Sequence, residues 1–145
     1  NPLVGHPERL PLNLIGDGRQ ALFHDSEIGG VTLYSSESLA ALQASVGTDL
    51  DGRRFRTNVV ISGVEAWEEL SWNGRLIIGD GEYEIEKTVT RCLATHVNPV
   101  DGYRDHEIMK SLVEVNQLKL PTFAIRMKPL NDDTVIRLGD VVSPM

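Results

Sequence analysis

The sequence has 145 residues and a net charge of -7 at pH 7, and its length suits one domain with its own hydrophobic core. The hydrophobic fraction of 41% and the charged fraction of 24% exclude a disordered or low-complexity chain. The acidic balance argues against a nucleic-acid partner, because phosphate backbones bind basic surfaces. No apolar run of about 18 residues occurs, so no membrane segment is predicted.

Cysteine usage and the first residue bear on where the protein occurs. Cys92 is the only cysteine, so an intramolecular disulfide is excluded. A free thiol is typical of a reducing compartment, and we therefore expect a cytoplasmic protein. The chain starts at Asn1 rather than at an initiator Met, which indicates a processed product or a piece of a longer protein.

The first 30 residues are rich in Gly and Pro. They contain one short apolar run, Leu12–Ile15, before the turn-like Gly16–Gly18. We expect one strand and a loop there, within an irregular N-terminal part.

A strand followed by a helix is predicted next. Val31–Tyr34 is rich in residues that favour strands, and it runs into Ser35–Ser38, where a serine can cap a helix. Leu39, Leu42 and Val46 recur at spacings of three and four, which is the period of one helix face. The expected order is strand, cap and helix.

The segment RRFRTNVVISG, residues 53–63, alternates charged and apolar residues and ends in Val59–Ile61, a pattern that predicts a strand. On such a strand Arg54, Arg56 and Asn58 share one face. Two guanidinium groups and an amide would suit a phosphate or a carboxylate. A solvated edge strand protected by its charges is the alternative.

A hairpin is predicted in the middle of the chain. Leu76–Ile78 and Tyr83–Glu86 flank Gly79–Gly81, and Asp-Gly sequences tolerate the positive φ of tight hairpin turns. Alternation continues beyond the second strand, so this strand is expected to extend through Cys92.

The remaining residues complete a mainly β pattern. Ile108, Leu112 and Val115 lie at helical spacing, and the tail from residue 122 onward gives two or three short strands. Several short strands with two peripheral helices favour a small β-barrel with helical covers. Because no linker or repeat is visible, residues 1–145 are interpreted as a single domain.

Cys92 has two interpretations. A lone cysteine is most often a small buried apolar residue. Alternatively, positive charge such as that of Arg91 could stabilise a thiolate that acts as a nucleophile or as a ligand for a soft metal. On a continuous strand Thr90 shares the face of Cys92, and spacing alone leaves both interpretations open.

Other features give no site. The four histidines lack metal-ligand spacing, so no zinc site is predicted. The two GDG segments lack a phosphate-cradle pattern and are interpreted as turns. Trp67 and Trp72 are expected to pack in the core or at its rim.

Four blocks of the sequence, taken in order, resemble the MOSC domain family. They are LYSSESLAAL, RRFRTNVVISGVEAWEELSWNGRLIIGD, KTVTRCLATHVNPVDGYRD and TVIRLGDVV, and they extend over about residues 31–142. The family is named for the C-terminal domain of molybdenum cofactor sulfurases and includes the amidoxime reducing component and bacterial relatives. The resemblance implies a β-barrel-rich fold and a site for molybdopterin, the organic part of the molybdenum cofactor.

The resemblance also implies roles for individual residues. Cys92 would be the catalytic residue, either as the molybdenum ligand or as a sulfur carrier. Arg56 and Asn58 would help to hold the phosphate and the polar edge of the pterin. Four further residues would lie near this cofactor pocket: Ser35, Ser36, Thr90 and Arg91.

Two departures from the family pattern stand out. Thr57 replaces the proline that usually follows RFR, which leaves an extra backbone donor. Cofactor-using members also carry an N-terminal β-barrel domain, and nothing before Val31 resembles it. We therefore interpret residues 1–30 as a remnant of that domain or as a junction to it.

The implied function is a molybdenum-cofactor domain of an oxidoreductase. It would reduce N-hydroxylated or similar small substrates with electrons from a separate donor protein, and enzymatic activity would depend on the missing N-terminal domain. The alternative is a non-catalytic or sulfur-carrier module, in which a persulfide on Cys92 delivers sulfur to a partner.

Overall fold

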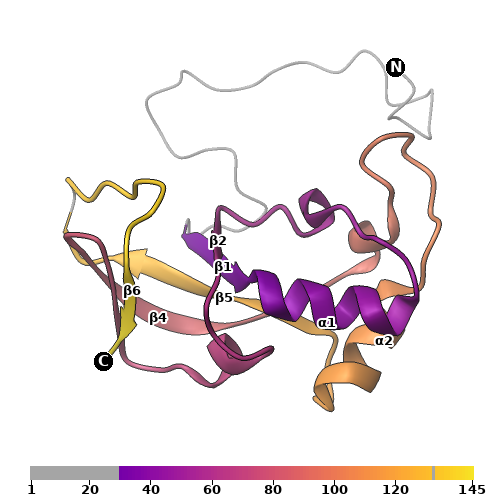
Figure 1. Cartoon of the computed structure of the whole chain (residues 1–145), viewed down its shortest axis with the longest axis horizontal. Helices are drawn as coiled ribbons and strands as arrows, with labels where there is room; N and C mark the ends of the chain where they lie inside the picture. Colours follow the sequence, from indigo (N-terminus) through magenta and orange to yellow (C-terminus); the bar gives the residue numbers. More distant parts are fainter. Residues whose placement is uncertain (1–29, 132) are drawn as a thin grey trace.

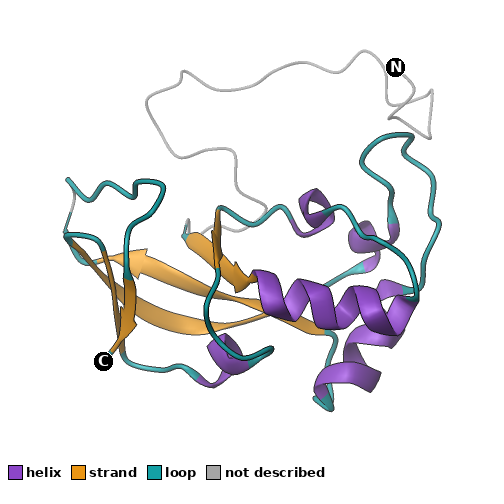
Figure 2. Cartoon of the chain, viewed as in Figure 1, coloured by secondary structure: helices purple, strands orange, loops and turns teal. Residues whose placement is uncertain are grey.

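The computed structural model describes residues 30–131 and 133–145. Within them one mixed sheet curls into a half-barrel, and helices cover one end of it (Figure 1 and Figure 2). The prediction of a mainly β fold with peripheral helices is confirmed. The strand predicted at Leu12–Ile15 and the interpretation of residues 1–29 lie outside the described residues.

The described strands are β1 (Val31–Ser35), β2 (Val59–Ile61), β3 (Arg75–Ile78), β4 (Gly81–Thr90), β5 (Thr122–Pro129) and β6 (Val142–Pro144). The described helices are α1 (Ser36–Val46) and α2 (Ile108–Asn116), with short 3-10 helices η2 (Gly52–Phe55), η3 (Glu68–Ser71) and η4 (Leu93–His96). The sheet order is β2-β1-β5-β4-β3-β6, in which only β1 and β2 run parallel.

The predicted serine cap of the first helix and the predicted hairpin turn are found, whereas the turn predicted at Gly16–Gly18 lies outside the described residues. The Ser35 side chain caps α1 by accepting a hydrogen bond from the Ser38 backbone N–H at 3.1 Å. The hairpin between β3 and β4 turns through Gly79, whose φ of 57° is in the left-handed region that glycine tolerates.

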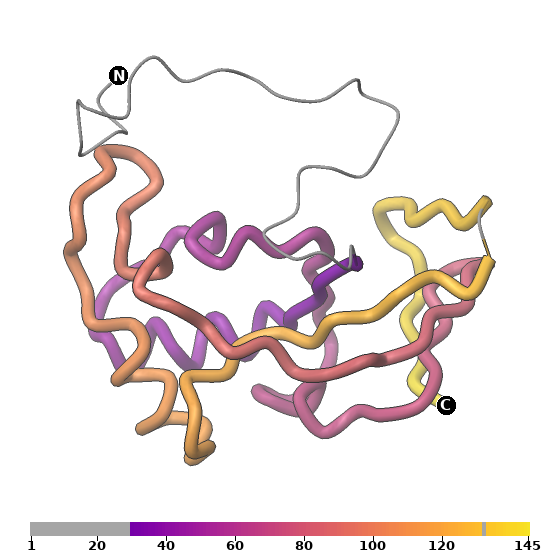
Figure 3. Tube along the Cα trace, turned by 180° about the vertical axis from the view of Figure 1, so that it is seen from behind, coloured from indigo at the N-terminus to yellow at the C-terminus, as the bar shows by residue number. Residues whose placement is uncertain are grey.

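Strands β4 and β5 run side by side through the middle of the sheet (Figure 3). Their register shifts twice, once between Thr88 and Thr90, where β5 contributes an extra residue. Ala124 lies in that shift with a φ of 78°, so β5 carries a bulge there. A bulge bends a strand and redirects its carbonyl groups, which matters for the site described below.

The core consists of two clusters joined by β5. The helix-side cluster comprises Tyr34, Leu42, Leu50, Phe55, Ile108, Leu112, Phe123 and Ala124. The barrel-side cluster comprises Leu33, Ile61, Leu76, Ile78, Tyr83, Ile125 and Met127. The rings of Phe55 and Phe123 stack with centroids 3.9 Å apart, so η2 is anchored on β5.

The strand predicted from Arg53 onward is wrong for its first half. Residues 52–55 form η2, capped by Asp51, which accepts from the Arg53 backbone N–H at 2.9 Å, and β2 begins only at Val59. Arg56 follows with a φ of 48°, which ends the helix. The capping aspartate and this left-handed residue break the alternation, so Arg54 is buried while Arg56 is exposed.

Candidate functional site

Cys92 lies just beyond the end of β4, as the N-cap residue of η4, and its side chain is exposed. The predicted continuation of the strand through Cys92 is therefore wrong. The chain turns because the Cys92 carbonyl accepts from the backbone N–H of Thr95 at 3.1 Å and from its hydroxyl at 2.9 Å. The backbone of Cys92 is held, while its thiol makes no capping hydrogen bond. The interpretation of Cys92 as a buried apolar residue is excluded.

Arg91, its neighbour, turns inward. Its guanidinium group donates to the Phe123 carbonyl at 2.7 Å, to the Phe55 carbonyl at 2.9 Å and to the Thr57 hydroxyl at 3.4 Å. It also lies 5.7 Å from the centroid of the Phe55 ring. Three neutral acceptors and an aromatic face thus surround this cation.

Partial burial changes the pKa of Arg91 but not its charge at neutral pH. Desolvation lowers the pKa of its guanidinium group to about 10, and the neighbouring Cys92 acts in the opposite direction. Arg91 therefore remains positively charged at neutral pH. A partly buried cation thus lies one residue away from the exposed thiol.

Arg54 is a second arginine in this region, and unlike Arg91 it is buried. It donates to both carboxylate oxygens of Asp105, at 2.8 and 2.6 Å, and to the His96 carbonyl at 3.2 Å. Hydrogen bonding to Arg54 holds the pKa of Asp105 below its usual range, and Asn98 also donates to Asp105. The Arg54 Nε atom is buried and has no hydrogen-bond partner among the described residues.

The residues predicted to hold the pterin fall into different surroundings. Arg56 is exposed, directly between the two residues of its segment that accept from Arg91. Asn58 is also exposed, and its side-chain oxygen accepts from the Thr32 backbone N–H at 2.9 Å, which fixes the start of β2 against β1. Thr90 is exposed at the end of β4, opposite Thr122.

Ser35 and Ser36 lie at the start of α1. The Ser35 hydroxyl is fully buried and donates to the Glu69 carboxyl at 3.1 Å, and the Ser38 hydroxyl donates to the same carboxyl at 3.0 Å. Ser36 is exposed and bonds to Glu37. The hydroxyl of Ser35 is thus engaged inside the fold, whereas Ser36 faces outward.

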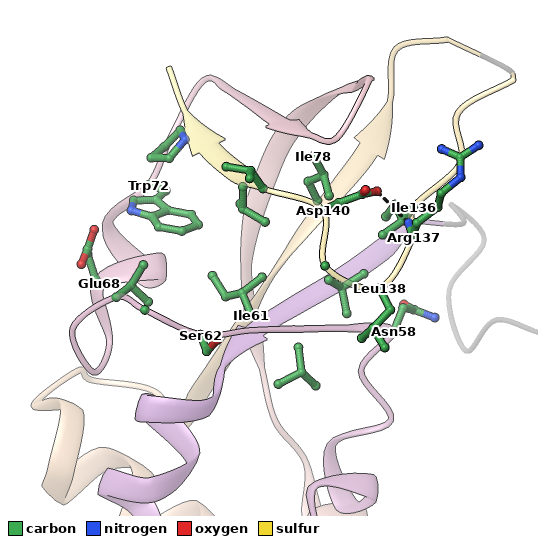
Figure 4. Close-up of a pocket in the computed structure, with 18 residues that line it drawn as sticks. Asn58, Ile61, Ser62, Glu68, Trp72, Ile78, Ile136, Arg137, Leu138 and Asp140 are labelled. Carbon is green, nitrogen blue, oxygen red and sulfur yellow. Dashed lines mark hydrogen bonds between the residues drawn. The ribbon is translucent and has the colours of Figure 1, made fainter.

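A groove of about 780 Å³ runs between β2 and the segment that leads into β6 (Figure 4). Ile61, Trp72 and Leu138 are among its lining residues. Asn58 is the only predicted site residue along it, beside Leu138 at the rim. The groove and the thiol of Cys92 are therefore separate features.

Sequence reasoning missed the residues that organise the site. Asp105 is 51 positions from Arg54, and Phe123 is 32 positions from Arg91, so no local pattern links these pairs. Thr95 is the exception, because a threonine three residues after Cys92 is typical of a local side-chain-to-backbone turn.

Two further findings concern the described residues only. They contain no group of three or more His, Cys, Asp or Glu side chains that could hold a metal ion. Their helices are all too short or too polar to cross a membrane.

The comparison with family models matches residues 22–143 to the MOSC domain. Because this match spans most of the 145 residues, the chain belongs to the MOSC domain family. The resemblance found in the four sequence blocks is thereby confirmed.

Curated relatives fall into two groups. Mitochondrial amidoxime-reducing component 1 of Mus musculus is 34% identical over 127 residues, which cover 81% of this chain and 37% of that protein. The human amidoxime-reducing component 1 is 35% identical over 77 residues, covering 53% of this chain and 23% of that protein. A molybdenum cofactor sulfurase of Drosophila pseudoobscura pseudoobscura is 28% identical over 114 residues, which cover 76% of this chain and 14% of that protein. The chain thus spans 37% or less of the length of these relatives.

Proposed function

We propose that this chain is the molybdenum-cofactor domain of an oxidoreductase, with Cys92 as the molybdenum ligand. The observation that carries the proposal is the exposed thiol of Cys92 on a turn whose backbone is fixed by Thr95. Membership of the MOSC family and the names of the relatives support it.

The chemistry of the surrounding residues fits such a cofactor. A thiolate is a soft ligand that suits molybdenum. The exposed guanidinium of Arg56 and the side chain of Asn58 suit a phosphate and a polar ring edge. The orphaned Nε of buried Arg54 leaves one further donor in the same segment.

The cofactor, when bound, would supply the redox chemistry for a small N-hydroxylated substrate, with electrons from a separate donor protein. The chain itself would hold the metal through Cys92 and orient the pterin through Arg56 and Asn58. We assign Thr90 and Ser36 to the rim of the proposed cofactor site around Cys92, because the side chains of both residues are exposed. A cytoplasmic location stays a prediction from the single free thiol.

A sulfur-carrier function is the second candidate. It is favoured by the exposure of Cys92, because a thiol that must meet a partner protein has to be accessible. In this function the outer sulfur of a Cys92 persulfide passes to a nucleophile on the acceptor, and Cys92 leaves as a thiolate. The relatives named molybdenum cofactor sulfurase motivate this alternative.

The experiment that tests the proposal measures molybdenum per chain after expression from the full natural coding sequence in a host that makes the cofactor. We expect metal in the parent protein, loss of metal in Cys92→Ser, and weaker retention in Arg56→Ala. Arg75→Ala is the matched control, because Arg75 is an exposed arginine on the far strand β3. A metal-free parent, or full loading of Cys92→Ser, would refute metal ligation by Cys92.

Mass spectrometry of the same preparations separates the two candidates. A persulfide on Cys92 in a metal-free protein supports the sulfur carrier. An unmodified thiol in a metal-free protein contradicts both functions.

A further inference from the structure

The two segments that carry the predicted cofactor residues are tied together by two arginines, of which Arg54 is buried and Arg91 is partly buried. Arg91, next to Cys92, donates to the Phe55 carbonyl and the Thr57 hydroxyl, on either side of Arg56. Arg54, in the segment of Arg56, donates to the His96 carbonyl at the end of η4, the helix that Cys92 begins. Each segment thus sends one guanidinium group into the other.

The residues that accept hydrogen bonds from Arg91 lie next to residues with strained backbone. Arg56, between its two acceptors in that segment, has a φ of 48°, and Ala124, directly after the acceptor Phe123, has a φ of 78°. A residue other than glycine is strained in the left-handed region, because its Cβ atom lies too close to the backbone carbonyl oxygen. Such conformations persist where surrounding contacts determine them, and here the guanidinium of Arg91 supplies those contacts.

The second arginine extends the arrangement to the loop beyond η4. The carboxylate of Asp105 accepts hydrogen bonds from both terminal nitrogens of Arg54, and Asn98 donates to the same carboxylate. The side chain of Arg54 is only 3% exposed. All three nitrogens of the Arg91 guanidinium and both terminal nitrogens of Arg54 donate to protein acceptors, so these nitrogens are engaged within the fold.

We propose that Arg91 and Arg54 are positioning residues, a cross-brace that fixes the separation between Cys92 and the Arg56 segment. The proposal reassigns Arg91 from contacting the cofactor to holding the residues that contact it. A planar guanidinium can serve three acceptors at once, whereas a lysine ammonium offers a compact charge without that geometry. Lysine at either position should therefore keep the charge and loosen the separation.

The effect on ligand binding rests on the proposed function, but the separation itself can be measured without any cofactor. Cys92 is the only cysteine, so a second one at exposed Arg53 gives a single defined pair for nitroxide spin labels. Double electron–electron resonance on doubly labelled Arg53→Cys protein then reports the distribution of distances between η2 and Cys92.

We expect one narrow distance in this background and a broadened or shifted distribution after adding Arg91→Lys or Arg54→Lys. Arg75→Lys, at an exposed ion pair with Glu82, is the control and should leave the distribution unchanged. If a lysine variant does not fold by circular dichroism, Thr57→Val and Asp105→Asn remove one acceptor each and take its place.

If the two arginines only stabilised the fold, the lysine variants would lower the free energy of unfolding but leave the distance between the labels in the folded protein unchanged. Distributions in folded Arg91→Lys and Arg54→Lys that match the control would therefore overturn the cross-brace. In unlabelled protein, we expect both lysine variants to retain several-fold less molybdenum than the parent. Unchanged loading despite a broadened distance would refute the effect on binding, whereas a metal-free parent refutes the proposed function and leaves the distance result decisive.

Discussion

At the scale of single residues, Cys92 and Arg91 are neighbours in sequence but occupy opposite environments. Thr95 turns the chain so that the thiol faces outward, while the side chain of Arg91 turns inward and lies against the stacked rings of Phe55 and Phe123. Burial of a cation without a carboxylate is costly, and three hydrogen bonds offset part of that cost. The residues next to Arg91 in the sequence do not indicate these acceptors, because the acceptors lie more than 30 positions away.

Asp105 gives a prediction about pH dependence. Its pKa is lowered in the folded protein, so its contribution to stability is present above its unfolded pKa of about 3.9 and is lost as pH falls through the folded value. Asp105→Asn should cost about 1 kcal/mol at pH 7, because the carboxyl is partly exposed and screened.

The measurement is the free energy of unfolding in urea for both proteins between pH 7 and pH 2.5. The difference between parent and Asp105→Asn should shrink below about pH 4. A difference that stays constant across this range would show that the pair with Arg54 does not titrate as described.

At the scale of elements, the buried carboxyl of Glu69 joins three of them. It lies on η3 and accepts from the Ser35 backbone N–H at 3.2 Å and from the hydroxyls of Ser35 and Ser38, where β1 passes into α1. The Ser38 hydroxyl in turn accepts from the Trp67 backbone N–H at 2.7 Å. The start of α1 is therefore fixed by a residue from a distant segment.

Glu69→Ala should destabilise the protein by about 2–4 kcal/mol, because it leaves several buried donors without an acceptor. Chemical denaturation followed by circular dichroism measures the loss. Glu65→Ala, at an exposed glutamate shortly before η3, is the matched control and should stay within about 0.5 kcal/mol of the parent. Equal losses in both variants would contradict a specific role for Glu69.

At the scale of the whole molecule, β5 couples the two core clusters. Phe123 belongs to the helix-side cluster, whereas Ile125 and Met127 belong to the barrel-side cluster. A single strand that contributes to both makes independent unfolding of either cluster unfavourable. We therefore expect one cooperative transition.

The two tryptophans test this coupling, because Trp67 packs on the helix-side cluster and Trp72 on the barrel-side cluster. In Trp67→Phe and Trp72→Phe, the remaining tryptophan reports one cluster by its fluorescence. In each variant, the fluorescence and circular dichroism transitions in urea should coincide. Separate transitions within either variant would show that the clusters unfold independently.

Much of the fold could be predicted because its signals are local. The Ser35 cap, the helical spacing of Leu39 and Leu42, and the turn at Gly79 each lie within a few residues of the structure they specify. The RFRTN segment was mispredicted because an alternating pattern describes a strand only when the backbone stays extended. Here the backbone is not extended, because Asp51 caps a 3-10 helix and Arg56 has a left-handed conformation.

The family and the mainly β architecture could be predicted from the sequence alone, because ordered motifs and hydrophobic periods can be recognised without knowledge of contacts. The exposure of Cys92, the burial of Arg54 and the hydrogen bonds of partly buried Arg91 became known only from the folded chain. Sequence patterns could not give them because the hydrogen-bond partners come from segments 32 to 51 residues away, such as Phe55, Phe123 and Asp105. Their positions follow from the curled sheet and its bulge rather than from any neighbouring residue.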